Sequence, residues 1–320
     1  MLMSASIEAR ESRPRPLFRH PIPRVRSRYR CKLPIIDPVP EDHLELHCME
    51  IWGGVEPADQ SISTPGLDLW VYSQPFEGDL EGGDVHYLSL CGGGLITRLV
   101  VADVSGHGSS VAEFSRSLRS MVRKAINHKS QDRFVEELNR RFSEMAKLRR
   151  FATALVMTYL ASTDRVAICN AGHPSPLLYR ARDRAWTLAT ELAVPPVDEL
   201  SDLPLGLDED TLYRSAEYAL GPGDKLVMYT DALSEAADAE GRMLGQDGLL
   251  ELARGLKFEG AQPAQWGDRL LAAVAQHRQD KAPDDDVTLV VLHHNATPQR
   301  RAGLAEKLDV YAKFFGIKDY

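Results

Sequence analysis

The chain has 320 residues, of which 43% are hydrophobic and 26% are charged, a composition that suits one large globular domain with appendages or two small domains. The net charge of -8 is unevenly spread: residues 1–40 carry eight Arg and Lys32 against three acidic residues, about +6, which leaves about -14 for the rest. An acidic body argues against a nucleic-acid surface on the main domain.

The four cysteines are widely spaced and contain no C-x-x-C pair, which argues against a disulfide framework and a structural zinc site. Arginines and prolines interrupt the N-terminal residues, so they do not form the apolar run of a signal peptide. No stretch approaches the roughly 20 apolar residues that a membrane span requires. We therefore expect a soluble, cytoplasmic protein.

The N-terminal part of the chain has a different texture from the rest. Residues 1–40 are basic and contain seven prolines, which predicts a disordered leader; a basic arm that docks an acidic partner, a membrane surface or nucleic acid is the alternative. We expect residues 41–65 to connect this leader to a main domain at 66–294. Residues 295–320 are predicted to form a C-terminal amphipathic helix and tail.

Hydrophobic patterns within the main domain predict strands, two helices, strands, two helices and a last strand. Alternating or continuous apolar runs predict strands at 67–73, 85–91, 95–104, 153–161, 165–171, 212–220, 225–229 and 287–293, with another hairpin within 175–189. Apolar residues at helical spacing predict helices near 109–126, 131–149, 247–256 and 263–279. Strands and helices in separate blocks favour an α+β layered sandwich over a parallel βαβ array.

Four aspartates lie at the ends of predicted buried strands, each beside a Gly, a Pro or another small residue: Asp84, Asp103, Asp231 and Asp285. Carboxylates on rigid strand ends suit hard cations such as Mg²⁺ and Mn²⁺. Two such ions about 3.5–4 Å apart can hold a hydroxide for in-line attack on phosphorus. A strand-end Asp more often caps a turn or is simply exposed, so the residue types alone leave both interpretations open.

Seven short motifs follow one another in a single order: Gly82-Gly83-Asp84, Ala102-Asp103-Val104-Ser105-Gly106-His107-Gly108, Asn170-Ala171-Gly172-His173-Pro174, Leu205-Gly206, Gly223-Asp224 leading to Tyr229-Thr230-Asp231, Ser234-Glu235-Ala236, and Asp285-Asp286-Val287-Thr288. This series resembles the protein phosphatase 2C superfamily, and within it the bacterial sporulation stage II E-type serine phosphatases. The resemblance covers roughly residues 66–294. It implies a four-layer α-β-β-α sandwich of two antiparallel sheets flanked by helix pairs.

The same resemblance implies a site for two ions of Mn²⁺ or Mg²⁺ at one end of the sandwich. Asp103 would bridge both ions, and the backbone carbonyl of Val104 would help to hold one of them. Asp231 and Asp285 would complete the shell of the other, and Asp84 would bind directly or through water. A water between the two metals would be the nucleophile, with Asp103 and Asp231 as the catalytic carboxylates.

Several neighbouring residues have roles that the motifs leave open. His107 is a candidate general acid for the leaving oxygen, with a turn-stabilising hydrogen bond as the alternative. His173 is predicted to be structural. Asp286 and Thr288 are expected to support Asp285 by hydrogen bonds. The choice of Asp285 over Asp284 or Asp286 rests on aligning one short acidic run, so the assignment could shift by a residue.

The chain departs from the family pattern in three ways. Ala232 stands where the family usually has Gly after the ligand aspartate, and a positive φ there would cost about 1 kcal/mol or more. Tyr87 stands where a further acid is common. No arginine corresponds to the phosphate clamp of the eukaryotic relatives.

The function that the resemblance implies is hydrolysis of phosphoserine and phosphothreonine in protein, with a small anti-sigma-factor antagonist as substrate and a regulatory protein as a further partner. The alternative is a catalytically weak or inactive phosphatase-like scaffold that binds a regulatory partner. A diguanylate cyclase, which also uses a Gly-Gly-acid hairpin, is disfavoured because Val85 and His86 follow Asp84. The oligomeric state stays open, with a dimer among the alternatives.

Overall fold

The computed structural model of the chain describes residues 43–45, 51–91, 94–106, 109–125, 130–145, 150–189, 201–257 and 261–297. The predicted leader at 1–40 and the predicted helix beyond residue 298 lie outside these residues. None of the described helices is long and apolar enough to cross a bilayer.

Two β-sheets lie face to face. The first has seven strands in the order β1 (His43–Glu45), β3 (Ala58–Thr64), β4 (Leu67–Gln74), β13 (Val287–His294), β12 (Lys225–Tyr229), β9 (Leu177–Arg180) and β10 (Ala185–Leu188). The second has six, in the order β11 (Ser215–Ala219), β8 (Arg165–Ala171), β7 (Ala152–Leu160), β6 (Ile96–Val104), β5 (Asp84–Cys91) and β2 (Ile51–Gly54). Neighbouring strands are antiparallel except β1 and β3, which pair in parallel at one edge.

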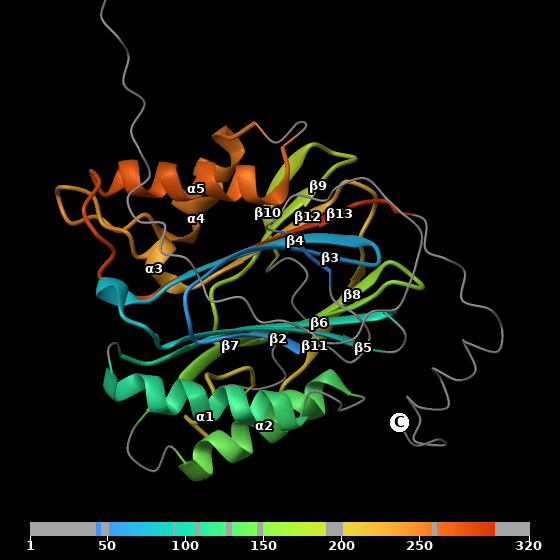
Figure 1. The fold of residues 1–320 in the computed structure, drawn as a ribbon, viewed down its shortest axis with the longest axis vertical. Helices are drawn as coiled ribbons and strands as arrows, with labels where there is room; N and C mark the ends of the chain where they lie inside the picture. The colour runs from blue at the N-terminus through green and yellow to red at the C-terminus, as the bar shows by residue number, and fades with distance from the viewer. Residues whose placement is uncertain are drawn as a thin grey trace, which may run out of the picture. The chain divides into compact units, whose positions relative to one another are not determined.

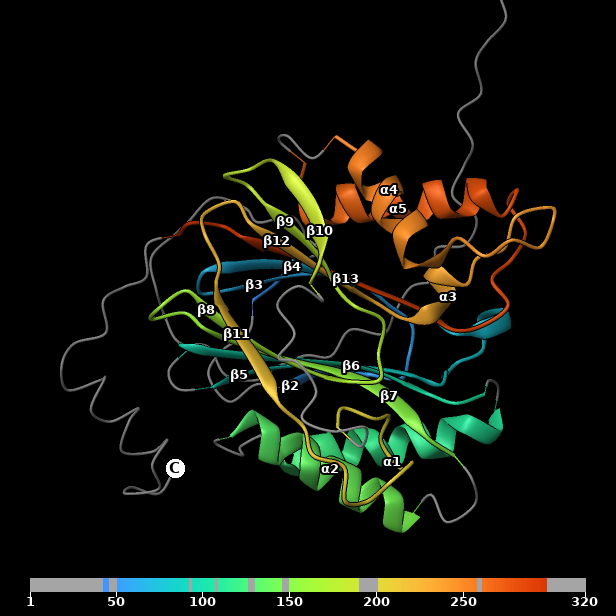
Figure 2. The same cartoon turned by 180° about the vertical axis from the view of Figure 1, so that it is seen from behind.

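Helices cover the outer faces of both sheets, as Figure 1 shows. The pair α1 (Ser109–Ala125) and α2 (Gln131–Met145) packs on the six-stranded sheet, and the pair α4 (Gly245–Gly255) and α5 (Pro263–His277) packs on the seven-stranded sheet. Two short elements complete the fold, the one-turn helix α3 (Asp231–Ser234) and the 3₁₀ turn η1 (Phe76–Gly78). The view from behind shows the same four layers (Figure 2). The predicted α-β-β-α sandwich is confirmed.

The side-chain alternation of the strands sorts the core into three apolar layers. On β6, Leu99 and Val101 point into the layer between the two sheets, whereas Val100 and Ala102 point toward α1 and α2. Successive side chains of a strand point to opposite faces, so Asp103 belongs to the set that faces the other sheet. The strand pattern thus carries a carboxylate to the end of the inter-sheet layer.

The sheets begin before residue 66. The segment that was expected to connect leader and domain contributes β1, β2 and β3, and β3 pairs with β4 along its whole length. Its sequence, Ala-Asp-Gln-Ser-Ile-Ser-Thr, has only Ala58 and Ile62 as buried apolar side chains, too few for an alternation to be recognised. The turn at Gly66, whose φ of +86° suits glycine, brings it back against β4.

Candidate active site

Asp84 and Asp103 stand directly opposite each other on neighbouring strands. Asp84 opens β5, Asp103 lies next to the end of β6, and the two are register partners in the antiparallel ladder. Asp84 is 2% exposed, and Asp103 is partly exposed. Both belong to the inward-facing sets of their strands, so the fold places two carboxylates side by side at one end of the inter-sheet layer.

A hydrogen-bond chain from the opposite sheet holds the Asp84 carboxylate. The hydroxyl of Thr230, at the end of β12, donates to Asp84 Oδ2 over 2.9 Å, and the same oxygen of Thr230 accepts the backbone N–H of Thr288 at 2.9 Å. All three residues are buried. The hydroxyl of Thr288 also influences the carboxylate, and a 3.0 Å hydrogen bond links it to Ser73. Thr288 therefore supports Asp84, whereas the sequence suggested support for Asp285.

Asp286 ties β13 to the segment that leads into Asp84. Its Oδ2 accepts the N–H of Gly83 at 2.6 Å, and its Oδ1 accepts the N–H of Phe76 at 2.6 Å. The approach requires two glycines, because a Cβ on Gly82 would lie 2.5 Å from Asp286 Oδ1 and one on Gly83 would lie 3.0 Å from Oδ2. Asp286 thus fixes the position of the peptide before Asp84.

The Gly83 position also faces two backbone carbonyls of the β6–α1 connection. A Cβ added there would lie 3.2 Å from the carbonyl oxygens of Val104 and Gly106. Gly106 has a φ of +98°, a conformation that favours glycine. The turn after Asp103 consequently presents carbonyl oxygens toward the β5 entry, where Asp286 contributes a carboxylate oxygen.

Asp231 begins helix α3 directly after β12 and is partly exposed. The N–H groups of Asp231 and Ala232 hydrogen-bond to its carboxylate. Ala232 lies inside the helix, is 9% exposed, and is absent from the non-glycine residues of positive φ in the described chain. The alanine that replaces the family's glycine therefore carries no left-handed strain.

The three consecutive aspartates before β13 have different environments. Asp284 is exposed, Asp285 is partly exposed and Asp286 is 3% exposed. The N–H of Asp286 donates to Asp285 Oδ1 at 2.8 Å, which fixes that carboxylate at the start of the strand. Asp285 is close enough to raise the pKa of Asp103, and Asp284 is not among the groups that do so.

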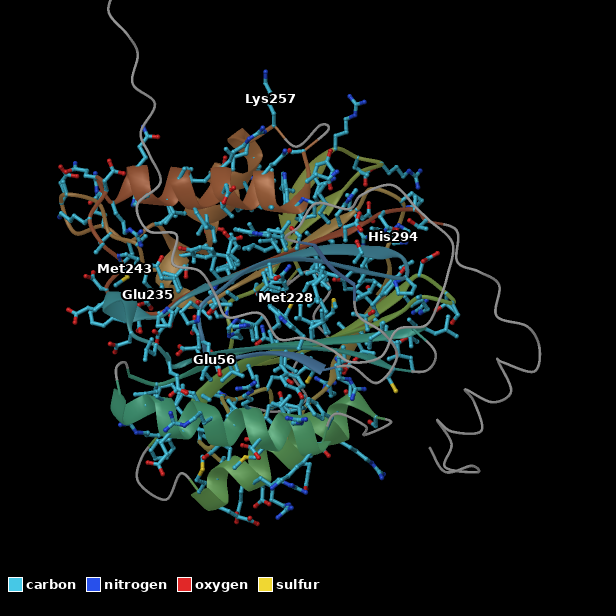
Figure 3. The ribbon with its side chains drawn as sticks, in the orientation of Figure 1. Glu56, Met228, Glu235, Met243, Lys257 and His294 are labelled. Atoms are coloured by element: carbon cyan, nitrogen blue, oxygen red, sulfur yellow. The ribbon has the colours of Figure 1, made fainter. Side chains whose placement is uncertain are left out.

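Negative charge is concentrated around Asp103. Burial, followed by the charges of Asp231, Asp285, Asp286 and Glu235, raises the pKa of Asp103 to about 8. The pKa of Asp84 is raised well above its ordinary value by burial and by Asp103 and Asp286, against the lowering effect of the two threonine hydroxyls. Figure 3 shows Glu235 at the end of the sandwich near η1 and α3, with His294 at the opposite end.

The donor set fits a hard divalent cation in chemistry and in charge. Its members are carboxylate and carbonyl oxygens, and no Lys or Arg in the described part of the chain forms an ion pair with Asp84, Asp103 or Asp231. As the side chains stand, no three His, Cys, Asp or Glu among the described residues are placed to hold one ion together.

The structure describes one of the two histidines of the motifs. His107 lies outside the described residues. His173 is 5% exposed, and its Nδ1 lies 2.9 Å from the hydroxyl of Thr153, the register partner of Asp103. Its backbone is fixed by Asn170, whose side chain both donates to the His173 carbonyl and accepts its N–H. These contacts agree with a structural role.

Four features of the site were not assigned from the sequence. Thr230 and the true partners of Asp286 could be identified only once β12, β13 and the β5 entry were placed together. Tyr87, at the position of the missing acid, points toward α1 and is 2% exposed, so that position does not face the inter-sheet layer. Arg150, just before β7, donates to the Ser105 carbonyl at 2.9 Å, two residues beyond Asp103.

The chain is similar in sequence to known phosphatases. Residues 95–295 match the family model described as Stage II sporulation protein E (SpoIIE). The phosphoserine phosphatase RsbP of Bacillus subtilis (strain 168) is 28% identical over 142 residues, which cover 43% of this chain and 33% of RsbP. The alignment thus spans a third of the length of that relative.

Solved structures share the fold. The RsbU and RsbW domains of a Mycobacterium tuberculosis protein are 25% identical with a TM-score of 0.58, covering 82% of this chain and 71% of that one. The PP2C phosphatase domain and regulatory fragment of SpoIIE from Bacillus subtilis is 16% identical with a TM-score of 0.58, covering 77% and 71%. RsbX in complex with magnesium is 16% identical with a TM-score of 0.52, covering 74% and 99%. Since the family model matches more than half of the residues, this chain belongs to the SpoIIE family of PP2C-type serine phosphatase domains.

Proposed function

We propose that this chain is a metal-dependent protein serine/threonine phosphatase that hydrolyses phosphoserine and phosphothreonine in protein substrates. One observation carries the proposal: Asp103 stands among five further acidic groups, at the end of an inter-sheet layer, in a chain of the SpoIIE family. Such a concentration of like charge destabilises the metal-free site and makes it a strong attractor for cations.

Asp103, Asp231, Asp285 and Asp84, with the carbonyl of Val104, are the groups that would hold two ions of Mn²⁺ or Mg²⁺. Such ions, when bound, supply Lewis-acid polarisation of the phosphate and an activated water at neutral pH. RsbX, a structural neighbour of this chain, was solved with magnesium, which supports the choice of a hard divalent ion.

Other residues of the chain hold the proposed metal ligands in position. Thr230 orients Asp84 from the opposite sheet, and Asp286 fixes the Gly83 peptide that precedes it. Groups that orient metal ligands in this way are worth a factor of about 10–100 in metal affinity or activity. His107, as general acid toward the leaving oxygen, remains part of the proposal on the strength of its motif alone.

The proposal also covers the substrate, the protein partner and the cellular location. We propose a small phosphorylated anti-sigma-factor antagonist as substrate, and a regulatory protein as a further partner, because the chain resembles RsbP, whose name describes a phosphoserine phosphatase. We propose a cytoplasmic location, and the described cysteines, Cys91 and Cys169, are free thiols in agreement with it. Comparing the phosphoproteomes of a deletion strain and its parent tests the substrate, which should rise in its phosphorylated form.

Hydrolysis of p-nitrophenyl phosphate by the purified full chain tests the activity. We expect turnover with Mn²⁺, none with excess EDTA, and loss in the variants Asp103→Ala and Asp231→Ala. Asp284→Ala is the matched control, because this exposed aspartate is not among the groups that act on Asp103. Metal-loaded wild-type protein without turnover of this compound or of any phosphoprotein would contradict the proposal.

A phosphatase-like scaffold is the second candidate function. The observation in its favour is that Tyr87, which points toward α1, stands where the family commonly has a further acid. A scaffold would bind its partner equally well with or without Mn²⁺ and would leave the cell's phosphoproteins unchanged on deletion. The two measurements above therefore separate the candidates.

A further inference from the structure

Arg150 lies beside the turn that follows the central aspartate. Its Nη1 donates to the carbonyl of Ser105 at 2.9 Å, and a Cβ on Gly106 would lie 3.3 Å from the same nitrogen. The next residue, Phe151, is joined to Ser105 by two hydrogen bonds, Ser105 N to Phe151 O at 3.0 Å and Phe151 N to Ser105 Oγ at 3.2 Å. The Asp103–Gly106 segment and the start of β7 thus form one continuous edge.

The guanidinium of Arg150 is held in place but has donors to spare. It lies over the ring of Phe114 on α1, 5.0 Å from the centroid, an arrangement that fixes its plane. Only one of its five N–H groups has a hydrogen-bond partner, Ser105, in the described part of the chain, and no described carboxylate forms an ion pair with it. The domain carries a net negative charge. An arginine that is held in place there without a carboxylate partner is available to bind an external anion.

Two exposed apolar residues lie on the backbone segments next to this arginine. Phe151 is 38% exposed and Leu207 is 55% exposed, although both types usually lie inside. The main chain brings them together, because Ala152 and Leu205 exchange two backbone hydrogen bonds of 2.9 and 2.7 Å, and a Cβ on Gly206 would lie 3.2 Å from the carbonyl of Arg150. We call Arg150, Phe151 and Leu207 the β7 rim.

We propose that the β7 rim binds the phosphorylated segment of the protein substrate. The Arg150 guanidinium receives the phosphate dianion, and Phe151 and Leu207 pack against apolar side chains next to the phosphoserine. This inference rests on the proposed function and names the surface that recognises the substrate. Arginine suits phosphate because its planar fork of donors can form two parallel charge-assisted hydrogen bonds.

Charge and position favour this occupant over others. A phosphoprotein that approaches the acidic domain meets repulsion away from the metal ions, and a cation at the edge of the site opposes that repulsion. The hydrogen bond to Ser105 places the guanidinium beside the turn that follows Asp103. The exposed Phe and Leu supply contact area that a small phosphate ester cannot use but a protein segment can.

The test compares two substrates of the Mn²⁺-loaded full chain, p-nitrophenyl phosphate and phosphoserine-containing casein. Arg150→Gln should raise KM for both by about tenfold or more, and Arg150→Lys should recover part of the loss. The double variant Phe151→Ser/Leu207→Ser should lower the ratio of kcat/KM for casein to that for the small ester by about fivefold or more. Leu160→Ser is the matched control, since Leu160 is also 38% exposed but ends the same strand at its far side.

Binding provides a readout that does not depend on turnover. Fluorescence anisotropy of labelled phosphocasein should show Kd raised about fivefold or more by Arg150→Gln and by the double variant, with Leu160→Ser at the wild-type value. Thermal melting confirms that each variant is folded. Wild-type KM and Kd in folded Arg150→Gln and double-variant protein would overturn the β7 rim, even if the wild type is an active phosphatase. An inactive wild type would overturn the proposed function, and anisotropy would still decide the rim.

Discussion

The hydroxyl of Thr230 donates to Oδ2 of Asp84 over 2.9 Å and so joins the end of one sheet to a carboxylate of the other. Since the same hydroxyl oxygen accepts the N–H of Thr288, the proton of Thr230 is directed at Asp84. The two sheets therefore meet at the candidate metal site through a hydrogen bond, in addition to the apolar contacts that join them elsewhere. Its removal should affect metal binding and stability together.

Thr230→Val keeps the shape of the side chain and deletes that hydrogen bond. We expect Mn²⁺ affinity, measured by calorimetric titration, to fall about 10–100-fold, because Asp84 loses its orientation. Thr230→Ser retains the hydroxyl and should stay within about threefold of wild type. Equal affinities in the Val and Ser variants would show that the hydroxyl does not orient the ligand.

Asp286→Asn should destabilise the metal-free protein. The carboxylate accepts two backbone N–H groups, from Gly83 and Phe76, whereas the amide has a single acceptor oxygen and must leave one of them unpaired. The expected loss in free energy of unfolding, from urea titration, is about 1–3 kcal/mol. Asp284→Asn, at an exposed neighbouring position, should change it by less than about 0.5 kcal/mol. A similar loss in both variants would contradict the role given to Asp286.

Gly82→Ala tests the close approach of β13 to the β5 entry. The added methyl would lie 2.5 Å from a carboxylate oxygen that is itself held by hydrogen bonds, so it cannot be accommodated without movement. We expect a loss of about 1–3 kcal/mol in unfolding free energy. Gly255→Ala, at the end of α4 with nothing within 4 Å of the new methyl, should be neutral or slightly stabilising. Unchanged stability of Gly82→Ala would mean that this approach is looser than described.

His173 predicts a pH dependence of stability. Burial lowers its pKa from 6.5 to about 3, so the ring is neutral in the folded chain and gains a proton only when the chain unfolds. The unfolded state therefore binds more protons below about pH 6.5, and the stability present above that pH is lost as the pH falls toward 3. By pH 4 the loss amounts to roughly 3 kcal/mol.

Buried aspartates act in the opposite direction, so the informative quantity is the difference between wild type and His173→Asn. Asn can still meet the Thr153 hydroxyl but does not titrate. Urea titrations between pH 7 and 4 should show a smaller decline in stability for the variant than for wild type. Parallel declines would assign the acid sensitivity to other groups.

The sequence predicted the layers and most strands, because their apolar residues alternate over five or more positions or form continuous buried runs. It missed the strands before residue 66, among them β3, whose polar composition carries only two buried apolar residues, and it missed α3, a single turn inside an expected loop. The motifs predicted that the aspartates share one site, and the structure brings Asp231 and Asp285 close enough to Asp103 to raise its pKa. They could not show that Asp286 and Thr288 support the Asp84 side, because that depends on β13 lying next to β4 and reaching across to β5.

The sequence also could not predict the position of Arg150. Nothing in its sequence neighbourhood distinguishes it from the other arginines of an arginine-rich stretch, where Arg149 precedes it. Its position next to Ser105 follows from the pairing of β6 with β7, and its lack of a carboxylate partner among the described residues is visible only once side chains are placed. Tertiary pairing, rather than local pattern, decides which charged residues reach a site.

The most direct measurement of the central claim is the release of inorganic phosphate from a phosphoserine peptide by the full chain as Mn²⁺ is titrated. We expect release to rise with Mn²⁺ occupancy, with calorimetry reporting two ions per chain, and we expect Asp103→Asn to lose both the release and the tight binding. Asp284→Asn should match wild type in both. Wild-type protein that binds two Mn²⁺ ions and releases no phosphate, or an Asp103→Asn variant that binds and hydrolyses as wild type does, would contradict the account.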